Sequence, residues 1–191
     1  MLTLFSTQPV FPEGFYYCPD FITIDEEELL INAVKSMPLH PLIFQGFEAK
    51  RKVKSYGYDY NFDSRQITAG EAIPDTLKFL TERVAGSLSV TPAEIAEILV
   101  TEYPPGSVIN WHRDAPPFDT IAGISLSTEC CFRFRPYDKS KQGRKNTLAL
   151  TVAPRSLYII AGEARHEWEH SIKPVKETRY SITFRTLIKK L

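Results

Sequence analysis

The sequence predicts an α+β fold in which helices near the N-terminus pack against a jelly-roll β-core. Amphipathic segments occur before residue 98, and short segments rich in β-branched and aromatic residues follow it. Short strands without long intervening helices are typical of a sandwich or barrel, of which a jelly roll is the simplest form. The 191 residues suffice for a single domain, with helices and a hairpin over about 1–97 and the β-core over about 98–191.

Two segments of the N-terminal half have helical periodicity. The first, TIDEEELLINAVKSM (residues 23–37), carries acidic residues at its start, where a helix dipole favours them. Its apolar face would contain Leu29, Leu30, Ala33, Val34 and Met37. The second is PDTLKFLTERVAGSL (residues 74–88), with inward positions at Leu77, Leu80, Val84 and Leu88. Thr91 and Glu94 then have the spacing of a capping box, which predicts a further short helix.

The predicted strands share alternating or continuous apolar residues bounded by turn residues. They are ILVTEY (98–103), IAGISLS (121–127), CCFRFRP (130–136), NTLALTV (146–152), SLYIIAG (156–162) and YSITFRTL (180–187).

Composition favours an ordinary soluble protein. Basic and acidic side chains number 23 each, so the formal net charge is zero and any nucleic-acid affinity must come from local patches. Cys18, Cys130 and Cys131 lack the C-x-x-C spacing of structural zinc sites. No apolar run could span a bilayer, and the first residues lack the basic start of a signal peptide. We therefore expect a cytoplasmic monomer without membrane association.

HEWEH, residues 166–170, matches the H-E-x-x-H signature of zinc peptidases, in which two imidazoles one helical turn apart bind zinc. Its flanks argue against a helix, because a strand-like segment and Gly162 precede it and Pro174 follows. A zinc peptidase therefore stays only a remote alternative, with His166 expected at the surface.

A second candidate metal site starts from WHRD, in which His112 and Asp114 would point to the same side of an extended segment. His170, just beyond a predicted strand, could complete a set of two histidines and one carboxylate. That set is the facial triad of non-heme Fe(II) oxygenases, which leaves metal positions open for a cosubstrate and O₂. Alone, H-x-D is a weak signal.

The segment RYSITFR, residues 179–185, strengthens this interpretation. As a strand it would direct Arg179, Ser181, Thr183 and Arg185 to one side and its apolar residues to the core. The two arginines would lie about 20 Å apart along a straight strand, so they could bracket a dicarboxylate, one at each end. Two solvated arginines are the simpler interpretation of the segment by itself.

Together, VTEYPPGSVINWHRD, GEARHEWEHSI and RYSITFRTL resemble the AlkB-like family of Fe(II)- and 2-oxoglutarate-dependent dioxygenases, strongly in the C-terminal half and loosely before it. The resemblance implies a double-stranded β-helix core and Fe(II) ligation by His112, Asp114 and His170. It also implies that 2-oxoglutarate is bound by Tyr103, by Arg179 at its distal carboxylate and by Arg185 near the iron-side end, with Thr101 and Ser181 as further polar contacts. Thr101 stands where well-known members have asparagine. The implied reaction consumes O₂ and 2-oxoglutarate and removes an N-methyl group as formaldehyde, with succinate and CO₂ as co-products.

The resemblance also places a nucleotide-recognition lid at AKRKVKSYGYDY, where basic and aromatic residues alternate as phosphates and stacked bases require. The expected substrate contacts are Arg51, Lys52, Lys54, Tyr56, Tyr58 and Phe118. The run APPF (115–118) departs from the acidic residue that repair members often carry there. A second basic loop, YDKSKQGRK, contains Lys139, Lys141, Arg144 and Lys145, and a merely solvated loop is an equally good interpretation of it.

The expected partner is alkylated single-stranded DNA or RNA, because an enzyme that modifies a base must extrude it or act on single strands. Two alternatives remain open at this point. The same oxygenase chemistry could act on a protein or a small molecule, since a fold does not fix a substrate. A binding module with a spent metal site is also possible, although the intact triad and both arginines argue against it.

Overall fold

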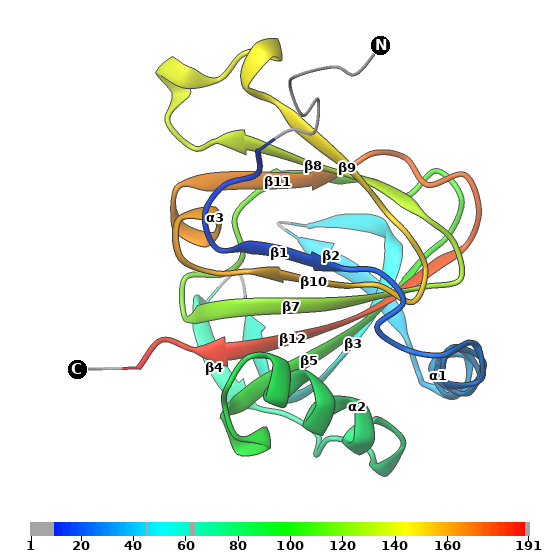
Figure 1. The fold of residues 1–191 in the computed structure, drawn as a ribbon. Helices are drawn as coiled ribbons and strands as arrows, with labels where there is room; N and C mark the ends of the chain where they lie inside the picture. The colour runs from blue at the N-terminus through cyan, green and yellow to red at the C-terminus, as the bar shows by residue number, and fades with distance from the viewer. Residues whose placement is uncertain (1–9, 45, 62–63, 190–191) are drawn as a thin grey trace.

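The computed structural model describes residues 10–44, 46–61 and 64–189 (Figure 1). The helices are α1 (Ile24–Ser36), α2 (Asp75–Ser87) and α3 (Gly162–His166). Single 3₁₀ turns are η1 (Pro92–Glu94), η2 (Lys139–Lys141) and η3 (Arg144–Asn146). The strands are β1 (Phe15–Cys18), β2 (His40–Phe44), β3 (Phe47–Asn61), β4 (Gln66–Ala69), β5 (Ile95–Tyr103), β6 (Ile109–His112), β7 (Phe118–Leu126), β8 (Cys130–Pro136), β9 (Leu148–Val152), β10 (Leu157–Ile160), β11 (Trp168–Ile172) and β12 (Arg179–Leu187).

The described strands form two antiparallel sheets. The large sheet has the order β1-β10-β7-β12-β5-β3-β2, with β4 paired to β3, and the small sheet has the order β6-β11-β8-β9. Neighbours in both sheets are mostly distant in sequence, and the chain passes from one sheet to the other several times, as a jelly roll requires. The predicted α+β fold with a jelly-roll core is confirmed.

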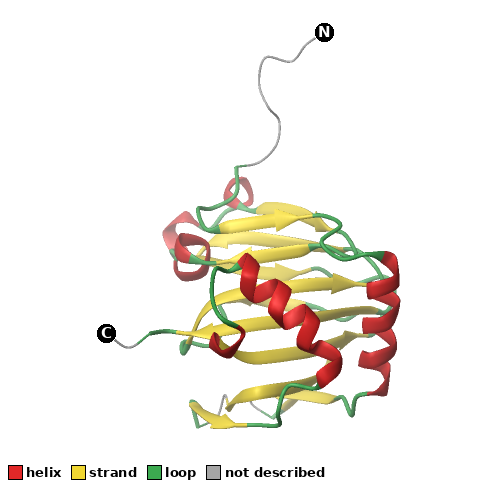
Figure 2. Ribbon diagram, turned by 60° about the horizontal axis from the view of Figure 1, so that its bottom comes forward, coloured by secondary structure: helices red, strands yellow, loops and turns green. Residues whose placement is uncertain are grey.

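Helices α1 and α2 lie across one face of the large sheet (Figure 2). Leu30 and Val34 of α1 and Leu80 of α2 are fully buried in the cluster that the helices form with this face. Leu29 is 51% exposed, so the predicted apolar face of α1 was wrong at that position. Glu27 of α1 is buried instead, and its carboxylate accepts a hydrogen bond from the Ser127 backbone and pairs with Arg155.

Both long helical segments begin and end close to the predicted limits, and α1 begins with a capping box that was not predicted. The Thr23 side chain accepts from the Glu26 backbone, and the Glu26 carboxylate accepts from the Thr23 backbone. The predicted capping box of Thr91 and Glu94 is present as well, although it opens the single turn η1 and not an α-helix.

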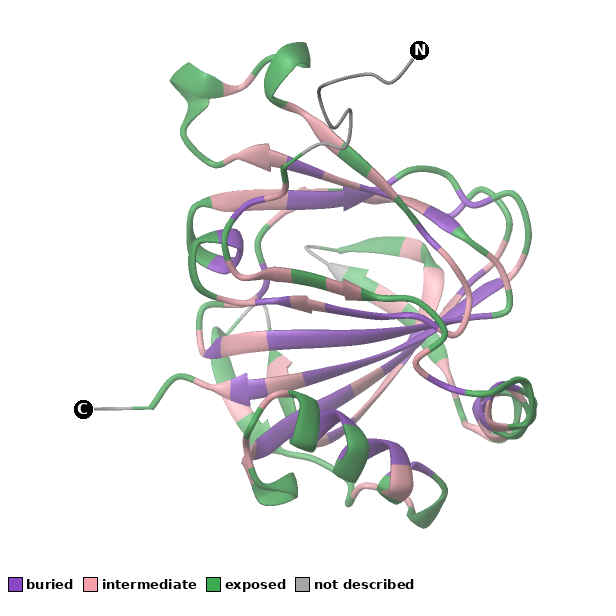
Figure 3. Ribbon diagram, viewed as in Figure 1, coloured by how far each residue is buried: buried purple, intermediate pink, exposed green. Residues whose placement is uncertain are grey.

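Strand β12 runs through the middle of the molecule and is buried on both faces (Figure 3). Tyr180, Ile182 and Phe184 pack towards the helices. Arg179, Ser181 and Thr183 are also buried, on the face that looks towards the small sheet. Two faces of opposite chemistry are therefore buried by two different layers, and the polar face lines the interior of the jelly roll.

Strand β3 pairs with different strands along its length, first with β2, then with β5 and finally with β4. It pairs with β5 from Lys52 to Gly57 and with β4 from Tyr58 to Asn61. Gly57 has φ +83, and a Cβ there would lie 2.4 Å from the Ala96 carbonyl oxygen, so only glycine fits this change of direction. We call β2, β3 and β4 the lid.

The expected boundary at about residue 97, between helices with a hairpin and the β-core, differs from the structure. Strand β5 begins at Ile95, and β1, β2 and β3 from the N-terminal part also pair within the large sheet. The cause is that edge strands of a jelly roll need covering partners, and the N-terminal segments provide them. Among the described helices, none has both the length and the apolar content needed to cross a membrane.

Two glycines give a matched test of the close packing between β7 and β10. Gly123 on β7 lies opposite Tyr158, and a Cβ at Gly123 would stand 2.1 Å from the tyrosine Cζ. A Cβ at Gly86 in α2 would meet no atom of the other described elements within 4 Å. We expect Gly123→Ala to lower the free energy of unfolding by about 1–3 kcal/mol through overpacking, and Gly86→Ala to raise it by about 0.5–1 kcal/mol. Urea denaturation of both variants measures this, and equal stabilities would contradict the close packing of Tyr158.

Candidate active site

A cavity of about 560 Å³ lies between the two sheets and extends under the lid. Its wall includes polar residues of β5 and β12, aromatic residues of the small sheet, and Arg51 of the lid. Such a volume is ordinary for a small-molecule site.

The cavity contains the three predicted metal ligands. His112 ends β6, Asp114 follows two residues later, and His170 lies opposite His112 in the register of β6 and β11. One nitrogen or oxygen atom from each residue lies within 4.8 Å of those of the other two. The His112 Nδ1 is 2.9 Å from the Asn110 carbonyl oxygen, which fixes the ring and turns Nε2 towards the cluster. The three side chains can therefore hold a metal ion on one face.

The protonation states suit metal binding. Burial lowers the pKa of His170 to about 3, so its imidazole is neutral at physiological pH. For Asp114, burial alone would raise the pKa, but the positive charge of Arg185 and the nearby imidazoles lower it overall. The buried carboxylate therefore stays ionised.

Arg185 holds the metal-ligand carboxylate in place. Its Nε and Nη2 donate to Asp114 Oδ1 at 3.0 and 2.7 Å, and its Nη1 donates to Glu97 Oε2 at 2.6 Å. Asp114 Oδ2 stays directed at the cluster, 3.4 Å from His170 Nε2. Burial raises the pKa of Glu97, although Arg185 opposes this effect.

The prediction that Arg185 grips one end of a dicarboxylate therefore needs correction. Its guanidinium is taken by two protein carboxylates, because the strand carries it beside Asp114 and Glu97. Its place near the metal ligands agrees with the expectation drawn from the family resemblance.

Arg179 is in the opposite situation. It is fully buried at the other end of the inner face of β12, where Nε donates to Ser125 Oγ at 3.1 Å and the guanidinium lies 4.9 Å from the Tyr103 ring centroid. Among the described residues, no group accepts a hydrogen bond from Nη1 or Nη2. A buried guanidinium with two open donors is suited to an incoming carboxylate. This feature fits the distal end of 2-oxoglutarate.

The other predicted cosubstrate residues lie on β5 and β12, and two of the three line the cavity. Tyr103 and Thr101 of β5 are buried in the cavity wall. Ser181 faces Thr101 in the strand register, and its hydroxyl donates to the Tyr103 hydroxyl at 3.4 Å.

Arg165 is a functional candidate that sequence reasoning missed. Its Nη2 donates to the carbonyl oxygens of Asp114, Ala115 and Phe118 at 3.2, 3.0 and 2.8 Å. It therefore fixes the segment that carries Asp114. The sequence signal was its presence in GEARHEWEH, close to His170, but no spacing rule links such a side chain to distant carbonyl groups.

Of the predicted substrate residues, Arg51 and Phe118 line the cavity, whereas Lys52 and Lys54 pair with carboxylates. Arg51 lines the cavity, near enough to Asp114 and Arg185 to interact with their charges, and Phe118 lines it from β7. Lys52 pairs with Glu102 at 3.0 Å, and Lys54 pairs with Glu71.

The two predicted tyrosines, Tyr56 and Tyr58, lie in different surroundings. Tyr56 is buried in the cluster beneath the helices, so its prediction as a base-stacking residue was wrong. Strand alternation turns its ring away from the cavity. Tyr58 is 42% exposed on the lid, and it is another lid residue, Tyr60, that approaches Phe118, with ring centroids 6.4 Å apart.

HEWEH spans two different elements. His166 ends α3, whereas His170 lies on β11, so their rings do not share one helical face. The short helix was not predicted, because Gly162 was expected to prevent one, yet α3 begins at that residue. His166 is half-exposed, 3.6 Å from Asp119, as expected for a surface histidine.

Comparisons with known proteins agree with this geometry. Residues 14–185 match the model of the 2OG-Fe(II) oxygenase superfamily. An Arabidopsis thaliana protein named "Alkylated DNA repair protein ALKBH8 homolog" is 30% identical over 183 residues, covering 83% of this chain and 50% of that protein. A Danio rerio protein named "Probable RNA/DNA demethylase ALKBH6" is 28% identical over 174 residues, covering 87% of this chain and 72% of that protein.

This chain thus spans only about half the length of the Arabidopsis relative. The solved structure of OsALKBH1 superimposes with a TM-score of 0.74 at 13% identity, covering 93% of this chain and 99% of that one, and it shows the shared fold. With the family model matched over nearly the whole chain, the protein belongs to the 2OG-Fe(II) oxygenase superfamily, whose reactions use Fe(II), 2-oxoglutarate and O₂, and its fold contains three residues that could hold the metal ion.

Proposed function

We propose that this enzyme oxidatively demethylates N-alkylated bases in single-stranded DNA or RNA. The observation that carries the proposal is that the metal-binding residues open on two cavities. The first extends towards Tyr103, beside Arg179, and a second cavity of about 920 Å³ lies between the start of β3 and residues 106–116. His112 and Asp114 line both. A cosubstrate in the first cavity and a nucleobase in the second would therefore both reach the metal-binding residues.

In this proposal His112, Asp114 and His170 hold the iron. Bound Fe(II) and 2-oxoglutarate supply the oxidation of a methyl C–H bond by O₂, which yields succinate, CO₂ and, from the N-hydroxymethyl product, formaldehyde. Arg179 and Tyr103 would hold the distal carboxylate, while Arg185 and Arg165 keep Asp114 in position. Arg51 would meet the substrate, because it lines both cavities.

The names of the relatives support a nucleic-acid substrate, since one is called an alkylated DNA repair protein and another a probable RNA/DNA demethylase. Aromatic rings of Tyr60 and Phe118 at the cavity offer the flat surfaces on which an extruded base packs.

The cosubstrate role of Arg179 predicts the effect of removing its side chain. Arg179→Ala should raise the KM for 2-oxoglutarate by about 10- to 100-fold, because charged hydrogen bonds are worth about 1.5–3 kcal/mol. Steady-state succinate formation at varied 2-oxoglutarate concentration measures this KM. Arg83→Ala, which removes an arginine on the outer surface of α2, is the matched control and should leave the KM unchanged. An unaltered KM in Arg179→Ala would exclude this role.

The contacts of Arg185 predict a change in metal affinity. Arg185→Gln should weaken Co(II) binding about 10- to 100-fold, because partners that orient a ligand typically have effects of that size. Loss of the positive charge should also raise the pKa of Asp114, so the affinity of the variant should fall at a higher pH than that of the wild type as the solution is acidified.

Cobalt titrations followed by absorbance from about pH 8 down to the lowest pH at which circular dichroism shows both proteins folded test both effects. Identical titration curves for variant and wild type would show that Arg185 does not position Asp114.

The proposed reaction is tested by mass spectrometry of oligonucleotides that contain 1-methyladenine or 3-methylcytosine. We expect loss of the methyl group with Fe(II), 2-oxoglutarate and O₂, and faster loss in single strands than in duplexes because the base need not be unpaired. His170→Ala is the inactive control. Equal turnover of duplex would contradict the strand preference, and succinate formation with every oligonucleotide unchanged would favour a protein or small-molecule substrate.

A further inference from the structure

The loop between β8 and β9, residues 137–147, concentrates positive charge on a chain whose net charge is zero. We call it the β8–β9 basic loop. Lys139, Lys141, Arg144 and Lys145 are all exposed, and no acidic residue lies among residues 139–145. In the described part of the protein, only Lys141 of these four has a carboxylate within 4.0 Å, that of Asp138 at 3.7 Å. Most of this charge is therefore available to a ligand.

The β8–β9 basic loop is held in a defined shape. The Gln142 amide donates to the carbonyl oxygens of Pro136 and Tyr137 at 3.1 and 3.3 Å. The Asn146 amide donates to the Lys141 carbonyl oxygen at 2.7 Å, and the Thr147 hydroxyl donates to the Gly143 carbonyl oxygen at 3.2 Å. The cationic side chains take no part in these bonds, so they project from a structured support.

The base of this loop touches the segment that carries the metal ligands. Arg113, between His112 and Asp114, places its guanidinium 3.6 Å from the ring centroid of Tyr137 and donates to the His166 carbonyl oxygen at 2.7 Å. The backbone N–H of Tyr137 donates to the Glu167 carbonyl oxygen at 2.8 Å. The basic loop therefore starts beside the mouth of the second cavity, which Arg113 and His166 also line.

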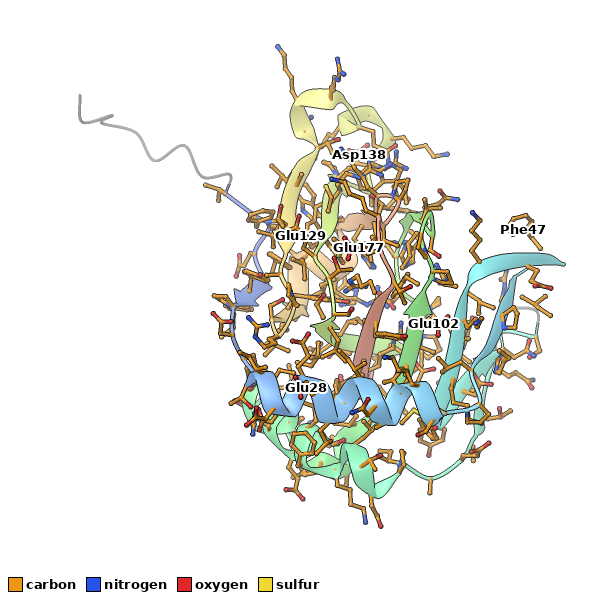
Figure 4. All side chains as sticks on the ribbon, turned by 90° about the vertical axis from the view of Figure 1, so that its right-hand side faces the viewer. Glu28, Phe47, Glu102, Glu129, Asp138 and Glu177 are labelled. Carbon is orange, nitrogen blue, oxygen red and sulfur yellow. The ribbon has the colours of Figure 1, made fainter. Side chains whose placement is uncertain are left out.

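More cations continue this surface along the outer face of the small sheet. Trp111 contacts both Arg133 and Arg135, whose guanidinium carbons are 4.7 and 4.6 Å from its ring centroid. Arg135 is neutralised by Glu169, whereas Arg133 donates only to the hydroxyl of Ser171 among the described residues. Figure 4 shows Asp138 at this end of the molecule, far from α1, and on a different projection from Phe47 of the lid.

We propose that the β8–β9 basic loop, with Arg113, Arg133 and Tyr137, binds the phosphate backbone of the strand that flanks the target base. This inference rests on the proposed function and names its substrate class as an oligonucleotide rather than a free nucleoside. Lysine and arginine bind phosphates and release counterions, and the exposed part of the Tyr137 ring offers a stacking surface for a base. A strand whose base enters the second cavity passes Arg113 before it reaches the loop.

Fluorescence anisotropy with a labelled single-stranded oligonucleotide of about 12 nucleotides tests the proposal without requiring turnover. In Lys139→Ala/Lys145→Ala, two phosphate contacts are lost, so we expect affinity to fall about fivefold and the plot of log affinity against log salt to flatten by about 1.4. Lys35→Ala/Lys78→Ala on α1 and α2 removes the same charge from the opposite end of the molecule and should match the wild type.

The outcomes separate this inference from the proposed reaction. Binding of the oligonucleotide by the loop variant with wild-type affinity and salt dependence would overturn the loop proposal alone. Loop-dependent binding by a protein that leaves every alkylated base unchanged would support the loop proposal and overturn the reaction. Failure of the wild type to bind the oligonucleotide at low salt would overturn both, as would binding to anionic lipid vesicles in place of the oligonucleotide.

Discussion

The contact of Arg185 with Asp114 and Glu97 joins the parts of the fold on which the active site depends. Arg185 lies on β12, Glu97 on β5 and Asp114 in the segment after β6, so one guanidinium connects both sheets. Buried charges cost several kcal/mol each unless they are paired. Here one cation serves two carboxylates, and Asp114 keeps an oxygen towards the histidines. A divalent metal ion held by Asp114 and the two histidines would offset negative charge at this site.

The polar interior is possible because both faces of the large sheet are covered, one by the helices and the other by the small sheet. Helices α1 and α2 cover the apolar back of β12 and β5, including Ile98, Ile182 and Phe184. The front of the same strands can then carry polar side chains, from Arg179 at one end to Arg185 at the other. Both arginines lie on one strand, but their surroundings give them different roles. One is satisfied by protein carboxylates, and the other has open donors.

Period-two alternation explains why the sequence predicted so much of this site. The H-x-D spacing placed His112 and Asp114 on one side, and the alternation in β12 separated its polar and apolar faces, as the structure has them. What failed depends on contacts distant in sequence. The partners of Arg185 and the three carbonyl groups held by Arg165 come from elements that no local pattern links. Tyr56 was misplaced because sequence does not reveal which face of β3 is covered by helices.

In the proposed function, His112, Asp114 and His170 would hold the metal and one end of an oxoacid, and the open donors of Arg179 would bind its other end. Calorimetric titration of 2-oxoglutarate and of pyruvate into the protein loaded with redox-inert Mn(II) tests this most directly, because both acids chelate a metal but only the first has a distal carboxylate. We predict that 2-oxoglutarate binds once per chain, only with metal, and at least about tenfold more tightly than pyruvate. Equal affinities, or binding of 2-oxoglutarate that does not require the metal, would contradict it.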